Sequence, residues 1–226
     1  MPSSRPNAIP TTVHVVRQLD PASILDVGVG FGKWGLLFRE YTDIRASEAD
    51  RHRYRKEAWK VRIDGIEGFP RYLTPVHEYV YDRLHVGLVQ DLVDGLEDYD
   101  VVHVGDMIEH LPKAEGMQIL EKLLRRSRKA LIVSTPKCDT HQADSVANEL
   151  ERHRSVWTKA DFRHFPGANV VTVDKTLLIA VIVKPGVCVP RLRPALSGLP
   201  GGSLGLWLKL PERIRRGLDP LRRRSA

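Results

Sequence analysis

The side chains most indicative of chemistry in this sequence surround a glycine-rich turn near the N-terminus. A short apolar segment containing Asp26 precedes Gly28, Gly30 and Gly32, which stand at alternate positions. A strand that turns into a helix through glycines lets a ligand touch the backbone, because no Cβ intervenes. A dinucleotide fingerprint would need its last glycine where this chain has Lys33. A carboxylate at Asp26 is an odd neighbour for a pyrophosphate, and it suits a ligand that carries an ammonium and a sulfonium.

A second motif, Val104–Leu111 (VGDMIEHL), follows the predicted strand Asp100–Gly105. With the acid-x-Gly-x-Gly-x-Gly form of the first motif, it makes residues 11–184 resemble the class I S-adenosylmethionine-dependent methyltransferases. The resemblance implies a Rossmann-like fold, S-adenosylmethionine as the cofactor, and a cofactor site that includes Asp26 and the three glycines. It also implies that Asp106 lies beside the cofactor, at the carboxyl edge of the sheet.

Two further acidic residues complete the cofactor site that the resemblance implies. Glu67 ends a predicted second strand, where a carboxylate can accept hydrogen bonds from both ribose hydroxyls, and Asp64 is the alternative. The 35 positions between the glycine turn and Glu67 exceed the spacing of about 20 expected, so we predict an insertion between them. If Glu48 or Asp50 ends the second strand instead, the assignment changes. Asp91 is expected near the adenine amino group, although a solvated loop aspartate would look the same.

Candidates for proton handling come from segments that follow strand ends. His153 lies in the polar segment His141–His164, beside Trp157, and can act as a general base near neutral pH. His110 is the alternative, with Asp106 beside it, although either histidine could equally be a surface residue or a turn cap. The histidines match no zinc-binding spacing such as HExxH, so we predict that no metal is required.

The elements that must position these residues alternate between strand and helix patterns. This alternation predicts an α/β, Rossmann-like, mostly parallel sheet covered by helices on both faces, with a C-terminal antiparallel hairpin. The polar stretch after residue 136 is expected to be helical. The predicted strands are Ser23–Val27, Val61–Glu67, His85–Gln90, Asp100–Gly105, Ala130–Val133, Val170–Val173 and Leu177–Val183; the predicted helices are Thr11–Leu19, Lys33–Glu40, Pro75–Leu84 and Lys113–Arg126.

The net charge of +7 is confined to the C-terminal end of the 226-residue chain. Residues 185–226 contain nine basic and two acidic side chains, whereas residues 1–184 contain equal numbers of each. Prolines and glycines punctuate the chain after Lys184, so we predict a cofactor-binding domain over residues 1–184 and a basic tail over 185–226. The apolar and basic segment 203–226 could contact a membrane surface or a protein, or fold back on the domain.

These patterns favour a methyltransferase of small molecules that acts at oxygen, with nitrogen as the alternative. A neutral domain argues against a nucleic-acid substrate. The competing interpretation is a non-catalytic Rossmann-like module whose tail docks to a membrane, nucleic acid or protein. With two cysteines, no apolar run that spans a membrane and no signal sequence, the chain is expected to be cytoplasmic. The sequence sets neither the acceptor nor the oligomeric state.

Overall fold

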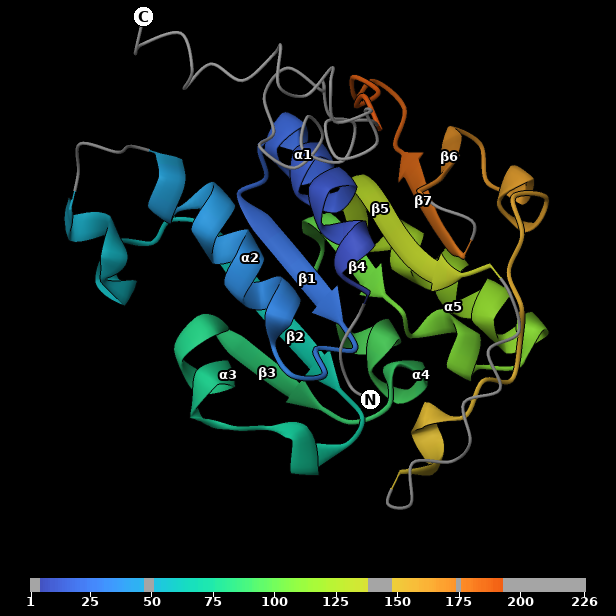
Figure 1. The fold of residues 1–226 in the computed structure, drawn as a ribbon, viewed down its shortest axis with the longest axis horizontal. Helices are drawn as coiled ribbons and strands as arrows, with labels where there is room; N and C mark the ends of the chain where they lie inside the picture. The colour runs from blue at the N-terminus through green and yellow to red at the C-terminus, as the bar shows by residue number, and fades with distance from the viewer. Residues whose placement is uncertain (1–4, 47–50, 138–147, 174–175, 193–226) are drawn as a thin grey trace, which may run out of the picture. The chain divides into compact units, whose positions relative to one another are not determined.

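A computed structural model describes residues 5–46, 51–137, 148–173 and 176–192, and these residues form a seven-stranded sheet (Figure 1). The strand order is β3-β2-β1-β4-β5-β7-β6, in which β1 to β5 run parallel and β7 runs antiparallel to both of its neighbours. The carboxyl ends of the parallel strands therefore meet at one edge. The strands are β1 (Ser23–Val27), β2 (Arg62–Glu67), β3 (Arg83–Val86), β4 (Tyr99–Gly105), β5 (Ser127–Pro136), β6 (Ala168–Thr172) and β7 (Leu177–Val183).

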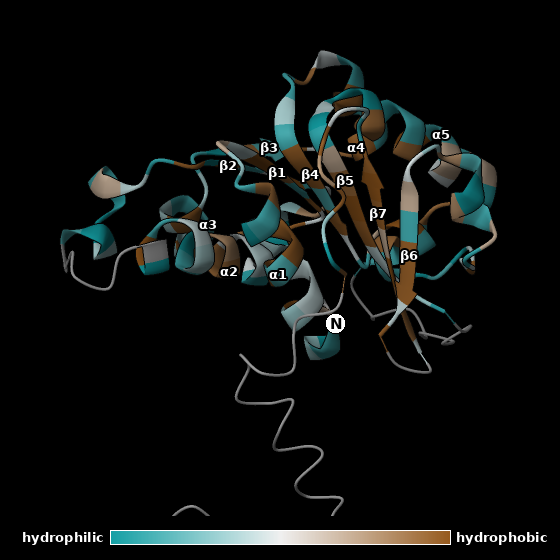
Figure 2. Ribbon diagram, turned by 90° about the horizontal axis from the view of Figure 1, so that it is seen from above, coloured by the Kyte–Doolittle hydropathy of each residue, from teal (hydrophilic) through white to brown (hydrophobic). Residues whose placement is uncertain are grey.

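Helices cover both faces of this sheet (Figure 2). Helices α1 (Ile9–Leu19), α2 (Lys33–Thr42) and α3 (Pro75–Val80) lie on one face, and α4 (Val89–Leu92) and α5 (Lys113–Arg125) lie on the other. Each face has its own apolar core, because successive residues of a strand point to opposite faces. Ile24 packs with the α1 and α2 side chains, whereas its neighbour Leu25 packs with those of α5.

The predicted architecture is confirmed, and β1 and β7 have the predicted bounds. The predicted helix Pro75–Leu84 is wrong in its second half. Helix α3 ends at Val80, because Tyr81 turns its hydroxyl towards Asp26 and residues 83–86 pair with β2 instead. The third strand accordingly lies earlier than the predicted His85–Gln90.

The polar stretch after β5 was expected to be helical, and that expectation is wrong for its described residues. Residues 148–167 contain two short 3-10 turns, Glu149–Glu151 and Asp161–His164, and no α-helix. Trp157 anchors this stretch by burying its ring under α5, with the Lys113 ammonium 4.0 Å from the ring centroid. The segment follows the sheet edge as an irregular wall.

The described chain continues past β7 along α1. Leu192 is buried in the core on the α1 face, and the Gln18 side chain exchanges two hydrogen bonds of 3.0 Å with the Arg191 backbone. A domain boundary near Lys184 stays a prediction, and the tail segment 203–226 lies outside the described residues. Among the helices that the structure describes, none combines the length and the apolar character needed to cross a bilayer.

Candidate functional site

A cavity of about 600 Å³ opens at the carboxyl ends of β1, β2 and β4. This is where open parallel sheets bind their ligands. One end is lined by the glycine turn and the residues that follow β2 and β3. The other end is lined by the residues that follow β4 and by residues 148–154. The cavity wall includes Gly28, Gly30, Lys33, Trp34, Glu67, Leu88, Gln90, Asp106, Glu109, His110, Leu150, His153 and Arg154.

The glycine turn has a backbone that other residues rarely adopt. Gly28, Gly30 and Gly32 have φ angles of 80°, 52° and 85°, all in the left-handed region. The turn is held against β2, because the amides of Gly28 and Val29 both donate to the carbonyl oxygen of Ile66, at 3.0 and 3.1 Å. A side chain in this turn would cost backbone strain, and at Gly28 its Cβ would lie 3.1 Å from the Met107 side chain.

Glu67 lies at the end of β2 and on the cavity wall, as the second-strand prediction requires. Its Oε2 accepts the Gly30 amide at 2.9 Å and its Oε1 accepts the Phe69 amide at 2.8 Å. An ionised carboxylate has about four acceptor positions, so it can still bind two hydroxyls. Burial raises the pKa of Glu67, and the two amide hydrogen bonds oppose that shift. Glu48 and Asp50 lie outside the described residues; the alternative Asp64 is buried and binds Arg62 and Tyr99.

Sequence analysis did not identify His77, which braces the glycine turn from behind. Its Nδ1 accepts the Thr74 amide at 3.0 Å, so the ring proton is on Nε2, and Nε2 donates to the Gly30 carbonyl oxygen at 2.9 Å. The ring is fully buried. The only sequence signal was the Thr74-Pro75 helix start, in which His77 is the third helical residue and completes the capping box.

Asp26 is not on the cavity wall, contrary to the expectation that it faces a cationic ligand. Its side chain is fully buried behind the turn. Oδ2 accepts the Tyr81 hydroxyl at 2.6 Å, and Oδ1 accepts Nδ1–H of His103 at 2.9 Å. Both oxygens are therefore used inside the protein, and Asp26 joins β1, β4 and the segment after α3. This position supports a structural role for the acid.

Two other predicted cofactor residues also lie away from the cavity wall. Gly32 begins α2 behind the turn, and Asp91 is exposed on α4. Leu88 and Gln90 line the cavity in this region instead. The reason is the short α4 helix, which points adjacent residues in different directions.

Asp106 lies at the opposite end of the cavity, directly after β4. It has a φ of 49°, which asparagine and aspartate tolerate better than other non-glycine residues. Its Oδ2 accepts the Arg5 amide at 3.1 Å, so the chain before α1 reaches the cavity wall. Arg5 is held there by a 2.6 Å hydrogen bond from Nη1 to the Thr176 hydroxyl.

Glu109 is a second residue that sequence analysis did not single out as a site residue. It is 2% exposed, it lines the cavity, and its Oε2 accepts the Thr135 hydroxyl at 3.0 Å. Burial and the nearby Asp106 carboxylate raise the pKa of Glu109 well above its usual value. Glu109 is the acidic residue of the IEHL motif. It was overlooked because the sequence alone does not show that its carboxylate is buried beside the cavity.

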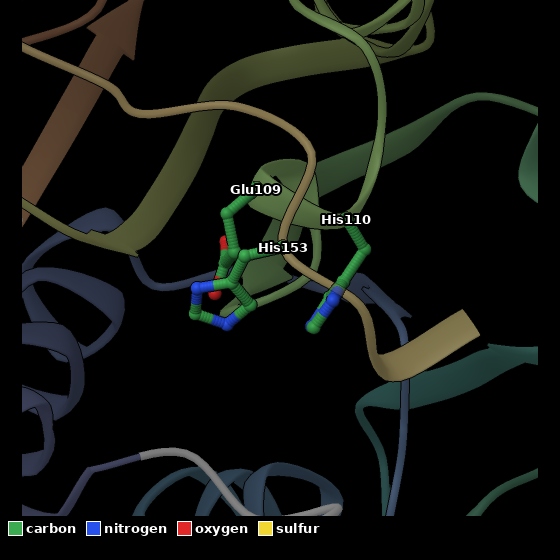
Figure 3. Close-up of side chains that lie close together, drawn as sticks. All are labelled: Glu109, His110 and His153. Atoms are coloured by element: carbon green, nitrogen blue, oxygen red, sulfur yellow. The ribbon is translucent and has the colours of Figure 1, made fainter. Parts of the chain in front are cut away.

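His110 and His153, the two proposed bases, lie together beside Glu109 (Figure 3). Their ring centroids are 5.0 Å apart in an edge-to-face arrangement. Both rings are half-buried and line the cavity. Burial lowers the pKa of His110, so its ring is neutral at pH 7. The structure thus brings together residues that are 43 positions apart in the chain.

Comparison with known proteins supports the fold through solved structures. No protein-family model matches the chain, and no curated protein sequence matches it. Solved structures do match. The N-terminal domain of EvdMO1, crystallised in the presence of SAH and D-fucose, is 16% identical with a TM-score of 0.53, over 80% of this chain and 83% of that one. The O-methyltransferase from Bacillus cereus in complex with SAH is 12% identical with a TM-score of 0.51, over 81% and 83%.

The methyltransferase domain of bacterial CtHen1 is 18% identical, with a TM-score of 0.50, over 79% of this chain and 98% of that domain. This chain has the fold of the class I methyltransferases. At these identities the likeness concerns the fold, and the site has to be argued from this chain's own residues.

Proposed function

We propose that the protein is an enzyme that transfers a methyl group from S-adenosylmethionine to a hydroxyl group of a small molecule. One observation carries the proposal. A single cavity extends from a glycine turn and a ribose-type carboxylate to a cluster of two imidazoles and two carboxylates. The first end suits a nucleoside cofactor, and the second supplies groups that can hold and deprotonate an acceptor.

At the cofactor end, the Glu67 carboxylate binds the two ribose hydroxyls. The backbone of Gly28 and Gly30 lies against the amino-acid portion of the cofactor, and Leu88 and Gln90 border the adenine. Lys33 adds a positive charge to the same wall, which suits the cofactor carboxylate. Asp26 and Gly32 lie behind the turn and fix its shape. Gln90 is the proposed neighbour of the adenine, and Asp91, the residue predicted from the sequence, is the alternative.

At the acceptor end, the reaction is an in-line displacement at a methyl group that the sulfonium has already activated. The acceptor oxygen bonds to the methyl carbon, the carbon–sulfur bond breaks, and its electron pair leaves on sulfur. The acceptor loses its hydroxyl proton to His153 or, failing that, to His110, with Asp106 beside them. An amine acceptor could use the same arrangement, so N-methylation is the alternative.

The partners and location follow the same proposal. A small-molecule acceptor fits a cavity of about 600 Å³, and the charge balance of residues 1–184 speaks against nucleic acid. We propose that the enzyme is cytoplasmic because its cysteine content is low. A membrane or protein contact through residues 203–226 stays a proposal. If the protein were instead a non-catalytic binding module, the cofactor end would be retained and the acceptor end would have no function.

Isothermal titration of the full chain with S-adenosylhomocysteine tests the cofactor assignment. We expect micromolar binding, about −8 kcal/mol, which Gly30→Val abolishes because a side chain enters the space of the ligand. Gly186→Val is the matched control, since this glycine also has a positive φ of 83° and its Cβ would meet nothing within 4 Å, and it should bind normally. Tighter binding of NAD than of S-adenosylhomocysteine would contradict the proposal.

A further inference from the structure

The cluster formed by Glu109, His110 and His153 has the composition and geometry of a metal centre. We infer that it binds a divalent transition-metal cation at the acceptor end of the cavity. Ligand atoms from the three side chains all lie within 4.8 Å of one another (Figure 3). Bonds of about 2.0–2.2 Å place the ligands of one ion about 3–4 Å apart. The cluster therefore needs to contract by about an ångström to close on an ion.

The backbone already fixes the segment that carries His153 against the turn that carries Glu109. The amides of Arg154 and Ser155 both donate to the carbonyl oxygen of Glu109, at 2.8 and 3.0 Å. On the other side of His153, the carbonyl oxygen of Arg152 accepts a 3.3 Å hydrogen bond from the His110 ring. Backbone groups of three neighbouring residues, Arg152, Arg154 and Ser155, thus hold the cluster in place.

The same hydrogen bond prepares the His110 ring for coordination. A carbonyl oxygen can only accept, so Nδ1 of His110 carries a proton in this hydrogen bond. Histidines that bind metals commonly donate their other ring nitrogen to a carbonyl or carboxylate in this way. The arrangement orients His110 as a ligand rather than as a turn cap.

The burial of Glu109 also favours a bound cation. Its side chain is 2% exposed, and its Oε2 accepts the Thr135 hydroxyl. A buried carboxyl group is costly to ionise unless a positive charge lies close to it. Asp106 lines the same part of the cavity and adds a second carboxyl group. A divalent ion held by Glu109 would stabilise its ionised form.

The ligand types indicate which ion binds. Two imidazoles and a carboxylate suit Mn²⁺, Fe²⁺, Co²⁺ or Zn²⁺, whereas Mg²⁺ and Ca²⁺ prefer oxygen ligands alone. All three side chains line the cavity, so an ion that they held would be accessible to an acceptor bound there. An open position of this kind is typical of a metal that acts in a reaction rather than in folding.

The use of the ion in the reaction rests on the proposed function. An acceptor hydroxyl on the ion loses its proton more readily, because the cation stabilises the alkoxide. The oxygen then bonds to the methyl carbon as the carbon–sulfur bond breaks, and the proton passes to the Asp106 carboxylate and from there to water. With the ion bound, Asp106 would replace His153 and His110 as the proton acceptor, and the two histidines would act as ligands.

Titration of the chelator-treated full chain with MnCl₂, followed by electron paramagnetic resonance, tests the site. We expect one saturable site whose affinity falls roughly tenfold or more in Glu109→Gln, His110→Ala and His153→Ala. His164→Ala is the matched control, because this histidine is exposed and pairs with Glu121. His153→Ala changes a half-buried residue of an irregular segment, so it keeps the test valid if Glu109→Gln fails to fold.

Absence of saturable uptake of both Mn²⁺ and Zn²⁺ would overturn the inference, as would equal affinity in all three variants and the His164→Ala control. Binding of S-adenosylhomocysteine to the chelator-treated protein is measured in parallel. If that binding is normal while no metal binds, the metal site fails and the proposed function stands. If metal binds and S-adenosylhomocysteine does not, the proposed function fails and the metal site stands.

Discussion

The two ends of the cavity are built in different ways. At the cofactor end, the glycine turn follows β1 and Glu67 ends the adjacent parallel strand β2. The Ile66 carbonyl oxygen accepts two amides of the turn, and the Glu67 carboxylate accepts a third. At the acceptor end, Glu109 and His110 lie in a single 3-10 turn, and His153 comes from an irregular segment after β5. Strand register positions the first end, and a few local hydrogen bonds position the second.

The comparison indicates that the two ends can be disabled separately. Substitutions at the acceptor end should remove turnover and leave the cofactor affinity intact. Substitutions around the glycine turn should weaken cofactor binding in proportion to the hydrogen bonds they remove.

The largest effect is expected from His153→Ala. Turnover should fall by about 10²–10⁴-fold, the contribution of a group that assists proton loss, while the affinity for S-adenosylhomocysteine stays within about twofold because His153 lies at the acceptor end of the cavity. The measurement is S-adenosylhomocysteine release with an acceptor found by screening hydroxylated small molecules. If both His153→Ala and His110→Ala keep wild-type turnover, the acceptor end has been misassigned.

Glu67→Ala should have the next largest effect, and it acts at the cofactor end. Loss of hydrogen bonds to a charged group should cost roughly 1.5–3 kcal/mol of binding free energy, about 10- to 150-fold in affinity. Isothermal titration with S-adenosylhomocysteine measures it. Glu48→Ala and Asp50→Ala serve as controls, and a larger loss in either control would show that Glu67 does not hold the ribose.

The pH dependence of cofactor binding should follow Glu67. Because burial raises the pKa of this carboxyl, it takes up a proton at a higher pH than an ordinary glutamate. Affinity for S-adenosylhomocysteine should therefore be constant above that pKa and should fall as the pH is lowered through it. Titrations across the acidic range test this. Glu67→Gln should bind more weakly and lose this pH dependence, and an unchanged profile in that variant would assign the titration elsewhere.

His77→Gln should have a smaller effect on the same end. The variant weakens the hydrogen bond that holds the Gly30 carbonyl, which is worth about 0.5–1.5 kcal/mol, or about 2- to 13-fold in affinity for S-adenosylhomocysteine. Val76→Ala changes an exposed residue of the same helix and should bind as the wild type does. Equal affinities in the two variants would show that the turn holds its shape without His77.

Removal of the C-terminal residues should have the smallest effect on binding. Chains ending at Leu192 and at Lys184 should both keep their affinity for S-adenosylhomocysteine, because no described residue after Arg154 lines the cavity. They should differ in stability. The shorter chain exposes the surface that Leu192 covers, at a cost of about 1.5–3 kcal/mol. Thermal unfolding measures this, and weaker binding by the longer chain would place part of the site beyond residue 192.

The sequence predicted which segments meet at the cavity, and it predicted the direction of individual side chains less well, for a physical reason. The strand pattern and the glycines at 28, 30 and 32 fixed where β1 ends, and the position of Glu67 followed from β2. Asp26 was misplaced because alternation along a strand does not tell which buried partners, here Tyr81 and His103, will use a carboxylate. The expectation that no metal is required rested on linear spacing alone. Linear spacing cannot show that His153 lies beside Glu109 in the fold, because that proximity depends on backbone hydrogen bonds from an irregular segment.

The two amides that share the Glu109 carbonyl oxygen have a consequence for how such a protein can diverge. Residues 148–154, which form the wall at the acceptor end, lie in the connection between β5 and the β6–β7 hairpin. The length and sequence of this connection can therefore change without shifting the register of any strand. The cofactor end would be inherited unchanged through such a replacement. Each new wall would have to keep one attachment, the pair of amides after His153, because that attachment returns the wall to the edge of the sheet. Descendants of this chain could thus acquire new acceptors while the rest of the fold is conserved.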